Sequence, residues 1–148
     1  MPTNYQITGQ KGETFVIKNC TCPKCKKKEK TLRKLPPNFK CADLICDFCG
    51  YLAQVKTMNV KDVEIKPDRI LGSASKPQEE RMDAGIFFPL FIVLMHTNKK
   101  AVYYLPADLQ VKEMFEKRKP LSQDAKRPGW QGFNYKIKDY KERMIRLI

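Results

Sequence analysis

Apolar positions along the chain predict a sheet that is buried in the core. The longest apolar run extends from Ile86 to Met95 and is interrupted by Pro89. Its length suits a buried strand and is too short to cross a bilayer. A second apolar run, from Ala101 to Pro106, follows after a polar turn. We therefore expect two neighbouring core strands in this half of the chain and an α/β fold.

Polar and turn-forming residues divide the rest of the chain into further elements. The segment through Asn19 is expected to be a helix capped by Thr8, and a central strand is expected to end near Met58. Residues 59–76 are expected to form a connection rich in loops. A second helix is expected over residues 77–84, because Gly85 is suited to ending it. A short helix is expected over residues 107–117.

Length and composition limit the number of domains, and the N-terminal residues indicate the cellular location. The chain has 148 residues, of which 42% are apolar, so it can bury one core but hardly two. We expect residues 1–148 to form a single domain. Residues 1–5 provide neither a basic start nor an apolar stretch, so they do not resemble a signal peptide. We expect a soluble, cytoplasmic protein with no membrane partner.

Charge gives the first indication of a binding partner. The chain has 29 Lys and Arg residues against 16 Asp and Glu residues, a net charge of +13. Such a surplus favours a polyanion as partner, because basic side chains displace the counterions of nucleic-acid phosphates. The alternative is a basic protein whose charge serves only solubility. Much of the charge lies in one segment, in which Lys26, Lys27 and Lys28 are candidate DNA contacts.

Six cysteines lie within thirty residues and none lies elsewhere. Four of them form two CxxC motifs separated by twenty residues: Cys22, Cys25, Cys46 and Cys49. This spacing is typical of a structural zinc site, because each motif directs two sulfurs at one point and two motifs complete a tetrahedron. The expected zinc-binding element covers residues 20–50.

Other roles for the cysteines agree less well with the sequence. A disulfide framework needs export, and a redox CxxC needs only one motif. Cys20 and Cys41 remain outside the pairs, either as packing thiols or as substitute ligands. His96 lies far away in sequence and is expected at a strand end or on the surface.

Residues that flank the second CxxC motif predict a hairpin with a polar face. If Cys46 faces Cys49 across the turn, antiparallel pairing sets Asp43 opposite Leu52. Side chains alternate with a period of two, so Gln54 and Lys56 then share the face of Asp43. Asp43 and Gln54 become diagonal neighbours on that face.

These three residue types together are suited to phosphodiester hydrolysis. Asp43 and Gln54 supply oxygen ligands that can hold magnesium against a phosphate. Lys56 supplies a positive charge for the attacking water and for the charge that develops on phosphorus. The alternative is an exposed strand face with ordinary polar residues. The zinc turn and the basic composition favour the catalytic interpretation.

The pattern resembles the PD-(D/E)xK nuclease superfamily in its Gln-x-Lys variant. More narrowly, the chain resembles the catalytic domain of Dam-replacing-type methyl-directed restriction endonucleases. The likeness is carried by a CPxC motif at Cys22, an Asp three residues before a second CxxC, and the acidic-x-Lys position at Gln54 and Lys56. It continues through the strands of residues 89–106 and through residues 126–134, which resemble an Arg-x-Gly-Trp-x-Gly-x-Asn segment.

This resemblance implies a restriction-endonuclease-like α/β fold, with a mixed central sheet flanked by helices and a hairpin bound by four cysteines and zinc. It also implies a magnesium-dependent endonuclease that acts on double-stranded DNA. Gln54 departs from the family, which has an acid there, and Glu13 on the first helix could add the missing carboxylate. Arg127 and Trp130 lie in a glycine-rich segment and are candidate DNA contacts, with core packing of Trp130 as the alternative. The sequence leaves open whether the protein forms a homodimer or acts with a partner subunit.

Two further functions fit the same residues. One is a zinc-ribbon protein that binds DNA or RNA without cutting it, and the other is a repair or junction nuclease. The first differs from the leading interpretation in the role of Asp43, Gln54 and Lys56, and the second differs only in substrate.

Overall fold

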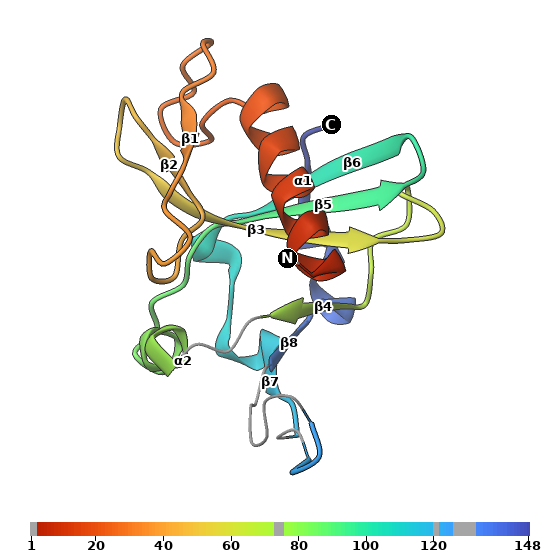
Figure 1. Cartoon of the computed structure of the whole chain (residues 1–148). Coiled ribbons are helices and arrows are strands. Elements are labelled where there is room, and N and C mark those ends of the chain that lie inside the picture. The colour runs from red at the N-terminus through yellow and green to blue at the C-terminus, as the bar shows by residue number, and fades with distance from the viewer. Residues whose placement is uncertain (1–2, 73–75, 120–121, 126–132) are drawn as a thin grey trace.

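The computed structural model describes residues 3–72, 76–119, 122–125 and 133–148. Two sheets make up its framework (Figure 1). The larger sheet has the order β1-β2-β3-β5-β6-β9, and the smaller has the order β4-β8-β7. The strands of the larger sheet are β1 (Leu32–Lys34), β2 (Leu44–Cys46), β3 (Leu52–Asn59), β5 (Leu90–His96), β6 (Lys99–Leu105) and β9 (Ile145–Arg146). Those of the smaller sheet are β4 (Arg69–Gly72), β7 (Phe115–Lys117) and β8 (Phe133–Lys136).

The larger sheet is mixed, as expected. Strand β3 runs parallel to β5, whereas the other neighbours in this sheet are antiparallel. The two predicted core strands are β5 and β6, which form a hairpin with buried residues along both strands. His96 ends β5 and is exposed, as expected, and its Nδ1 lies 2.9 Å from the carbonyl oxygen of Val60.

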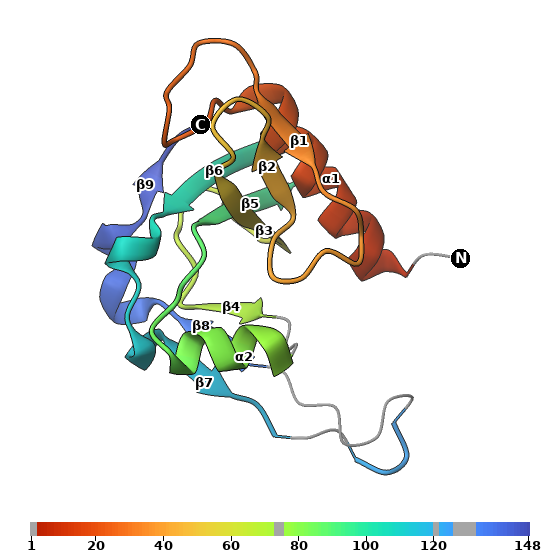
Figure 2. The ribbon, with the colours of Figure 1, turned by 90° about the vertical axis from the view of Figure 1, so that its left-hand side faces the viewer.

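Alternating side chains of β5 separate two cores. Phe91 and Val93 pack with Val16 of helix α1 (Asn4–Asn19) on one face of the larger sheet. Ile92 and Leu94 pack on the other face with residues of the smaller sheet such as Tyr135. Figure 2 shows α1 along one side of the larger sheet, with the smaller sheet and helix α2 (Lys76–Asp83) at its other side. The fold is therefore α/β, with a mixed central sheet between helix and sheet layers.

Helix α1 lies very close to β3 at one glycine. A Cβ atom built on Gly12 would lie 1.8 Å from Thr57 Oγ1, so only glycine fits there. Glu13 is the next residue on the helix. The close approach therefore sets how near Glu13 lies to the strand that carries Gln54 and Lys56.

The expected first helix is present, but Thr8 does not cap it. Thr3 is the N-cap, and it forms a capping box in which its side chain accepts from the Gln6 amide while the Gln6 side chain accepts from the Thr3 amide. This reciprocal pair of hydrogen bonds stabilises the beginning of the helix several residues before Thr8, so Thr8 lies inside the helix. The second expected helix corresponds to α2, and Gly85 follows it with φ of +78°.

Two segments differ from the expectation because pairing within the smaller sheet determines their structure. The connection of residues 59–76 contains β4, which pairs with β8. Residues 107–117 form two 3-10 turns, η1 (Ala107–Leu109) and η2 (Lys112–Met114), and then β7. Phe115 pairs with Tyr135 and its ring stacks on Phe87, so strand pairing and aromatic packing replace a helix there.

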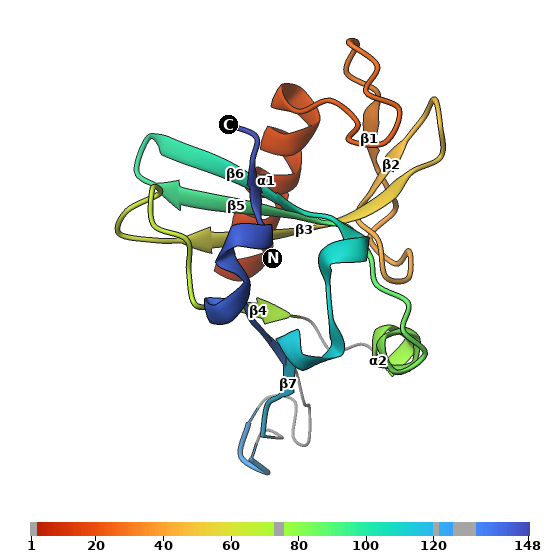
Figure 3. The ribbon, with the colours of Figure 1, turned by 180° about the vertical axis from the view of Figure 1, so that it is seen from behind.

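Figure 3, the view from behind, shows the last described segments on the side of the larger sheet opposite helix α1. A 3-10 segment, η3 (Lys138–Arg143), leads from β8 to the edge strand β9. Within the described ranges, no helix is both long and apolar enough to cross a membrane.

Candidate active site and metal centre

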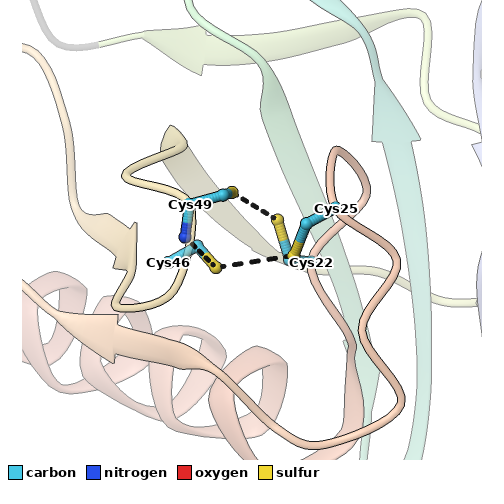
Figure 4. Close-up of side chains that lie close together, drawn as sticks. All are labelled: Cys22, Cys25, Cys46 and Cys49. Atoms are coloured by element: carbon cyan, nitrogen blue, oxygen red, sulfur yellow. Dashed lines mark hydrogen bonds between the residues drawn. The ribbon is translucent and has the colours of Figure 1, made fainter.

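The four paired cysteines lie together, as their spacing predicts (Figure 4). All four Sγ atoms are within 4.8 Å of one another, with 3.6 Å between Cys22 and Cys49 and 3.9 Å between Cys25 and Cys46. In a tetrahedral zinc site the sulfurs are about 3.8 Å apart, because Zn–S bonds are about 2.3 Å long. The four thiols are therefore close enough together to hold a zinc ion after small shifts.

Polar contacts favour a thiolate at Cys46. Its Sγ lies 3.1 Å from Thr31 Oγ1 and accepts from the Cys49 amide at 3.5 Å. Burial opposes ionisation, but these hydrogen bonds lower the pKa of the Cys46 thiol below its usual range. Zinc binds thiolates, so the cluster has one sulfur prepared for the metal.

Cys20 and Cys41 lie outside the four-cysteine cluster. Cys20 is buried, and burial raises the pKa of its thiol to about 11, which is typical of a packing thiol. Cys41 adopts a left-handed backbone with φ of +68°, directly before the segment that leads to Asp43.

The predicted register of the hairpin is wrong by two residues. Ile45, not Asp43, pairs with Leu52, and Leu44 pairs with Ala53. The Cys46 amide bonds to the carbonyl of Tyr51 at 2.8 Å, so Cys46 faces Tyr51 across the turn. Two cysteines of one CxxC motif bring their sulfurs together within a turn, and they need not be cross-strand partners.

Asp43 lies where β2 begins, and it bonds to β3 through both its backbone and its side chain. Its amide donates to the Ala53 carbonyl at 2.9 Å. Its carboxylate oxygen Oδ2 accepts from the Val55 amide at 2.8 Å. The carboxylate thus takes the place of a backbone carbonyl as the partner of the Val55 amide. This bond holds Asp43 close to Gln54 and Lys56, the residues before and after Val55.

Glu13, Asp43 and Lys56 form one electrostatic group. Burial and the charge of Asp43 raise the pKa of Glu13, although Lys34 Nζ lies 3.2 Å from Glu13 Oε2. Burial lowers the pKa of Lys56, and the charges of Asp43 and Glu13 oppose this shift. Glu13 and Asp43 also line a cavity of about 360 Å³ between α1 and the segment that follows β1. The structure therefore brings together the three predicted catalytic side chains that can carry charge.

Gln54 is held in a different way. It is 4% exposed, and its Oε1 accepts from Gln78 Nε2 and from the Tyr135 hydroxyl, both at 3.2 Å. Its Nε2 donates to the carbonyl of Cys41 at 2.8 Å. No sequence pattern indicates a role for Tyr135, because it lies 81 residues from Gln54 and belongs to another sheet.

Of the three lysines that directly follow the first CxxC motif, Lys27 contacts the second motif. Lys26 and Lys28 are exposed, and Lys27 Nζ lies 4.1 Å from the centre of the Phe48 ring. The metal centre therefore carries positive charge at its surface. Arg127 and Trp130, the other predicted DNA contacts, lie outside the described residues.

A comparison with protein families relates this chain to a known family. A family model described as DpnI, Dam-replacing family, matches residues 3–146. No curated protein matches the chain. The matched range includes the four cysteines, Glu13, Asp43 and Lys56.

Proposed function

Because this chain belongs to the Dam-replacing family, we propose that it is a metal-dependent endonuclease that hydrolyses phosphodiester bonds of double-stranded DNA. The family makes it a restriction-endonuclease-like protein, and a role in restriction or defence follows from that membership. We assign the site to the Gln-x-Lys variant of the PD-(D/E)xK pattern. The observation that carries the proposal is the electrostatic group of Glu13, Asp43 and Lys56, of which Glu13 and Asp43 line a cavity, in a chain of charge +13.

The donor set at this cavity fits magnesium. Mg²⁺ prefers oxygen ligands and usually binds proteins through one or two carboxylates. Asp43 and Glu13 supply two carboxylates, and the charge of Asp43 raises the pKa of Glu13, so a cation between them would relieve their repulsion. We therefore assign Asp43 and Glu13 as the magnesium ligands. Gln54 was expected to be a ligand as well, but its amide oxygen already accepts two hydrogen bonds.

The roles of the side chains follow from charge. Magnesium at Asp43 and Glu13 would supply Lewis-acid stabilisation of the phosphate oxygens. Lys56 Nζ places a positive charge beside the two carboxylates, where it can orient the attacking water and offset the negative charge that develops on the phosphate. Because burial lowers its pKa, Lys56 can also exchange a proton more readily than a surface lysine.

We infer that residues 1–148 act as one nuclease domain that includes the zinc element of residues 20–50. Cys22 and Cys46 are buried in the same core as Val16 of α1 and Phe91 of β5. Zinc binding and the position of α1, which carries Glu13, are therefore parts of one packing arrangement.

Incubation with supercoiled plasmid tests the proposed activity. Zinc-loaded protein should convert the plasmid to open and linear forms with Mg²⁺ and should leave it intact when Mg²⁺ is omitted. Adenine-methylated and unmethylated plasmids, and a four-way junction, would separate restriction from repair. DNA binding with no cleavage of any of these substrates would instead support a zinc-ribbon binding protein.

We expect the lysines at the metal centre to contact DNA phosphates. Changing Lys26, Lys27 and Lys28 to Gln should weaken binding to all sequences alike. It should reduce the slope of log K against log salt by about 0.9 for each phosphate that the protein no longer neutralises. Fluorescence anisotropy at several salt concentrations measures this slope.

A control separates local contacts from total charge. Lys61, Lys99 and Lys138 are exposed and lie outside the zinc element. Changing these three to Gln alters the net charge equally and should affect the slope less. Equal slopes for both triple variants would mean that Lys26, Lys27 and Lys28 form a solvated surface.

A further inference from the structure

Side chains connect β3 to the segment that leads into β2, beyond the last paired residues of the hairpin. The backbone register covers Ile45–Leu52 and Leu44–Ala53. On the far side of these pairs, the Val55 amide donates to the Asp43 carboxylate, and Gln54 Nε2 donates to the Cys41 carbonyl. The position of Asp43 relative to β3 therefore depends on these two bonds as well as on the strand ladder.

The other end of the Gln54 side chain is fixed by two donors. Gln78 Nε2 of α2 and the Tyr135 hydroxyl of β8 both donate to Gln54 Oε1, and Gln78 Nε2 also lies 3.1 Å from the Tyr135 oxygen. An amide oxygen has two lone pairs, so both are used. Gln54, Gln78 and Tyr135 are at most 4% exposed. Water cannot readily replace buried hydrogen bonds of this kind, so the three side chains form a rigid connection between the two sheets and α2.

We propose that Gln54 is a positioning residue, clamped by Gln78 and Tyr135, that holds Asp43 and Lys56 at their working separation and does not bind the metal. This inference rests on the proposed function, because it assigns a role within that active site. Gln54 is two residues from Lys56 on one strand and, through Cys41, two residues from Asp43 on the other segment. Gln54 lies on β3 with Lys56, and its side chain donates a hydrogen bond to the segment that carries Asp43.

Two chemical features explain why an amide suits this position. A carboxylate could accept from Gln78 and Tyr135 but could not donate to the Cys41 carbonyl, so that link would be absent. Cys41 adopts a left-handed conformation, which is unfavourable for a residue with a side chain. The bond from Gln54 Nε2 helps to stabilise that backbone.

Three variants of the full-length, zinc-loaded protein test the inference. Gln54→Met removes all the hydrogen bonds of the amide, and Tyr135→Phe removes one donor while keeping the ring. Gln110→Met is the matched control, since Gln110 is also buried and its Nε2 donates to the carbonyls of Phe88 and Leu105. The control removes comparable buried hydrogen bonds without touching Asp43 or β3.

The first readout does not require activity. Amide hydrogen exchange at Val55 reports whether its bond to Asp43 persists. We expect exchange at Val55 to become about tenfold faster in Gln54→Met and Tyr135→Phe, and to remain unchanged in Gln110→Met. Unchanged exchange at Val55 in both network variants would overturn the positioning role, whether or not the wild type cuts DNA.

Metal affinity provides the second readout, with Mn²⁺ as the probe in electron paramagnetic resonance. Gln54→Met should bind Mn²⁺ within about threefold of wild type, whereas Asp43→Asn should bind it at least about tenfold more weakly. If Gln54→Met loses as much Mn²⁺ affinity as Asp43→Asn, Gln54 is a ligand and the inference is wrong.

Kinetics complete the test. The network variants should lower kcat by about 10- to 100-fold with little change in KM, because small displacements of catalytic groups reduce rates strongly. The double variant should be no slower than the slower single variant, since both changes disrupt one unit. A wild-type protein that does not cleave any DNA would refute the proposed function alone, because the exchange at Val55 would still decide the positioning role.

Discussion

Changing Cys46 to Ser is expected to abolish the cooperative thermal unfolding transition and DNA cleavage together. Cys46 is fully buried, and its Sγ contacts Thr31, Cys25 and Cys49 within the cluster. Structural zinc contributes an apparent binding free energy of about 10–16 kcal/mol in small zinc domains. This is comparable to the whole stability of a typical domain, about 5–15 kcal/mol. Loss of one ligand therefore removes much of the free energy that holds the fold.

Elemental analysis and circular dichroism measure this effect. Wild-type protein should contain one zinc per chain, and Cys46→Ser should contain much less. Cys20→Ser is the matched control, because Cys20 is also buried but lies outside the cluster. It should keep its zinc and its transition, with a modest decrease in Tm. Full zinc content and an unchanged Tm in Cys46→Ser would show that the cluster is not a structural zinc site.

Changing Lys56 to Met is expected to reduce kcat by about 10²- to 10³-fold while DNA affinity stays near that of wild type. The proposed role of Lys56 is to stabilise charge that develops in the transition state, so its loss should affect the rate more than binding of the substrate. Single-turnover cleavage and anisotropy measure the two effects separately. A Lys56→Met protein that cleaves at the wild-type rate would remove Lys56 from the mechanism.

The same variant should not lose stability, and the sign follows from the pKa. Burial lowers the pKa of Lys56 in the folded state below its unfolded value, so the ammonium opposes folding at neutral pH. This penalty is present below the folded pKa and disappears as pH rises toward the unfolded value. Lys56→Met should therefore unfold at an equal or higher temperature at pH 7 and should lack this pH dependence.

Lys66 provides a contrasting control. Its Nζ donates to the carbonyl of Lys141 at 2.8 Å, which makes it a structural lysine. Lys66→Met should lower Tm and leave kcat unchanged, the opposite of Lys56→Met. Similar behaviour of both variants would indicate that the loss of kcat reflects general disruption.

The sequence predicted those parts of the site that depend on local spacing. The spacing of the two CxxC motifs identifies the four clustered cysteines without knowledge of the strand arrangement. The match to the Dam-replacing family confirms the resemblance to that family. Side-chain alternation placed Asp43 near Lys56 although the register was wrong, because an error of two residues keeps the same face. The expected mixed sheet and first helix are also present.

The remaining features depend on contacts between distant segments. The clamp of Gln54 by Tyr135 joins residues in two sheets, and no local pattern marks it. Strands β4 and β7 form because they pair with β8, so their own residues predict them poorly. The hairpin register depends on which residue Cys46 faces across its turn, and the CxxC spacing does not determine that.

The rate of plasmid cleavage by Asp43→Asn, measured against wild type at equal zinc content, tests the nuclease assignment most directly. Asparagine can still accept the hydrogen bond from the Val55 amide, so the fold and the zinc site should persist. The negative charge is removed, however, so the affinity for magnesium should fall if Asp43 is the proposed ligand. We expect Mg²⁺-dependent cleavage to decrease by about 10³-fold or more, the equivalent of several kcal/mol. Cleavage by folded, zinc-loaded Asp43→Asn at the wild-type rate would contradict the assignment of this site as a nuclease centre.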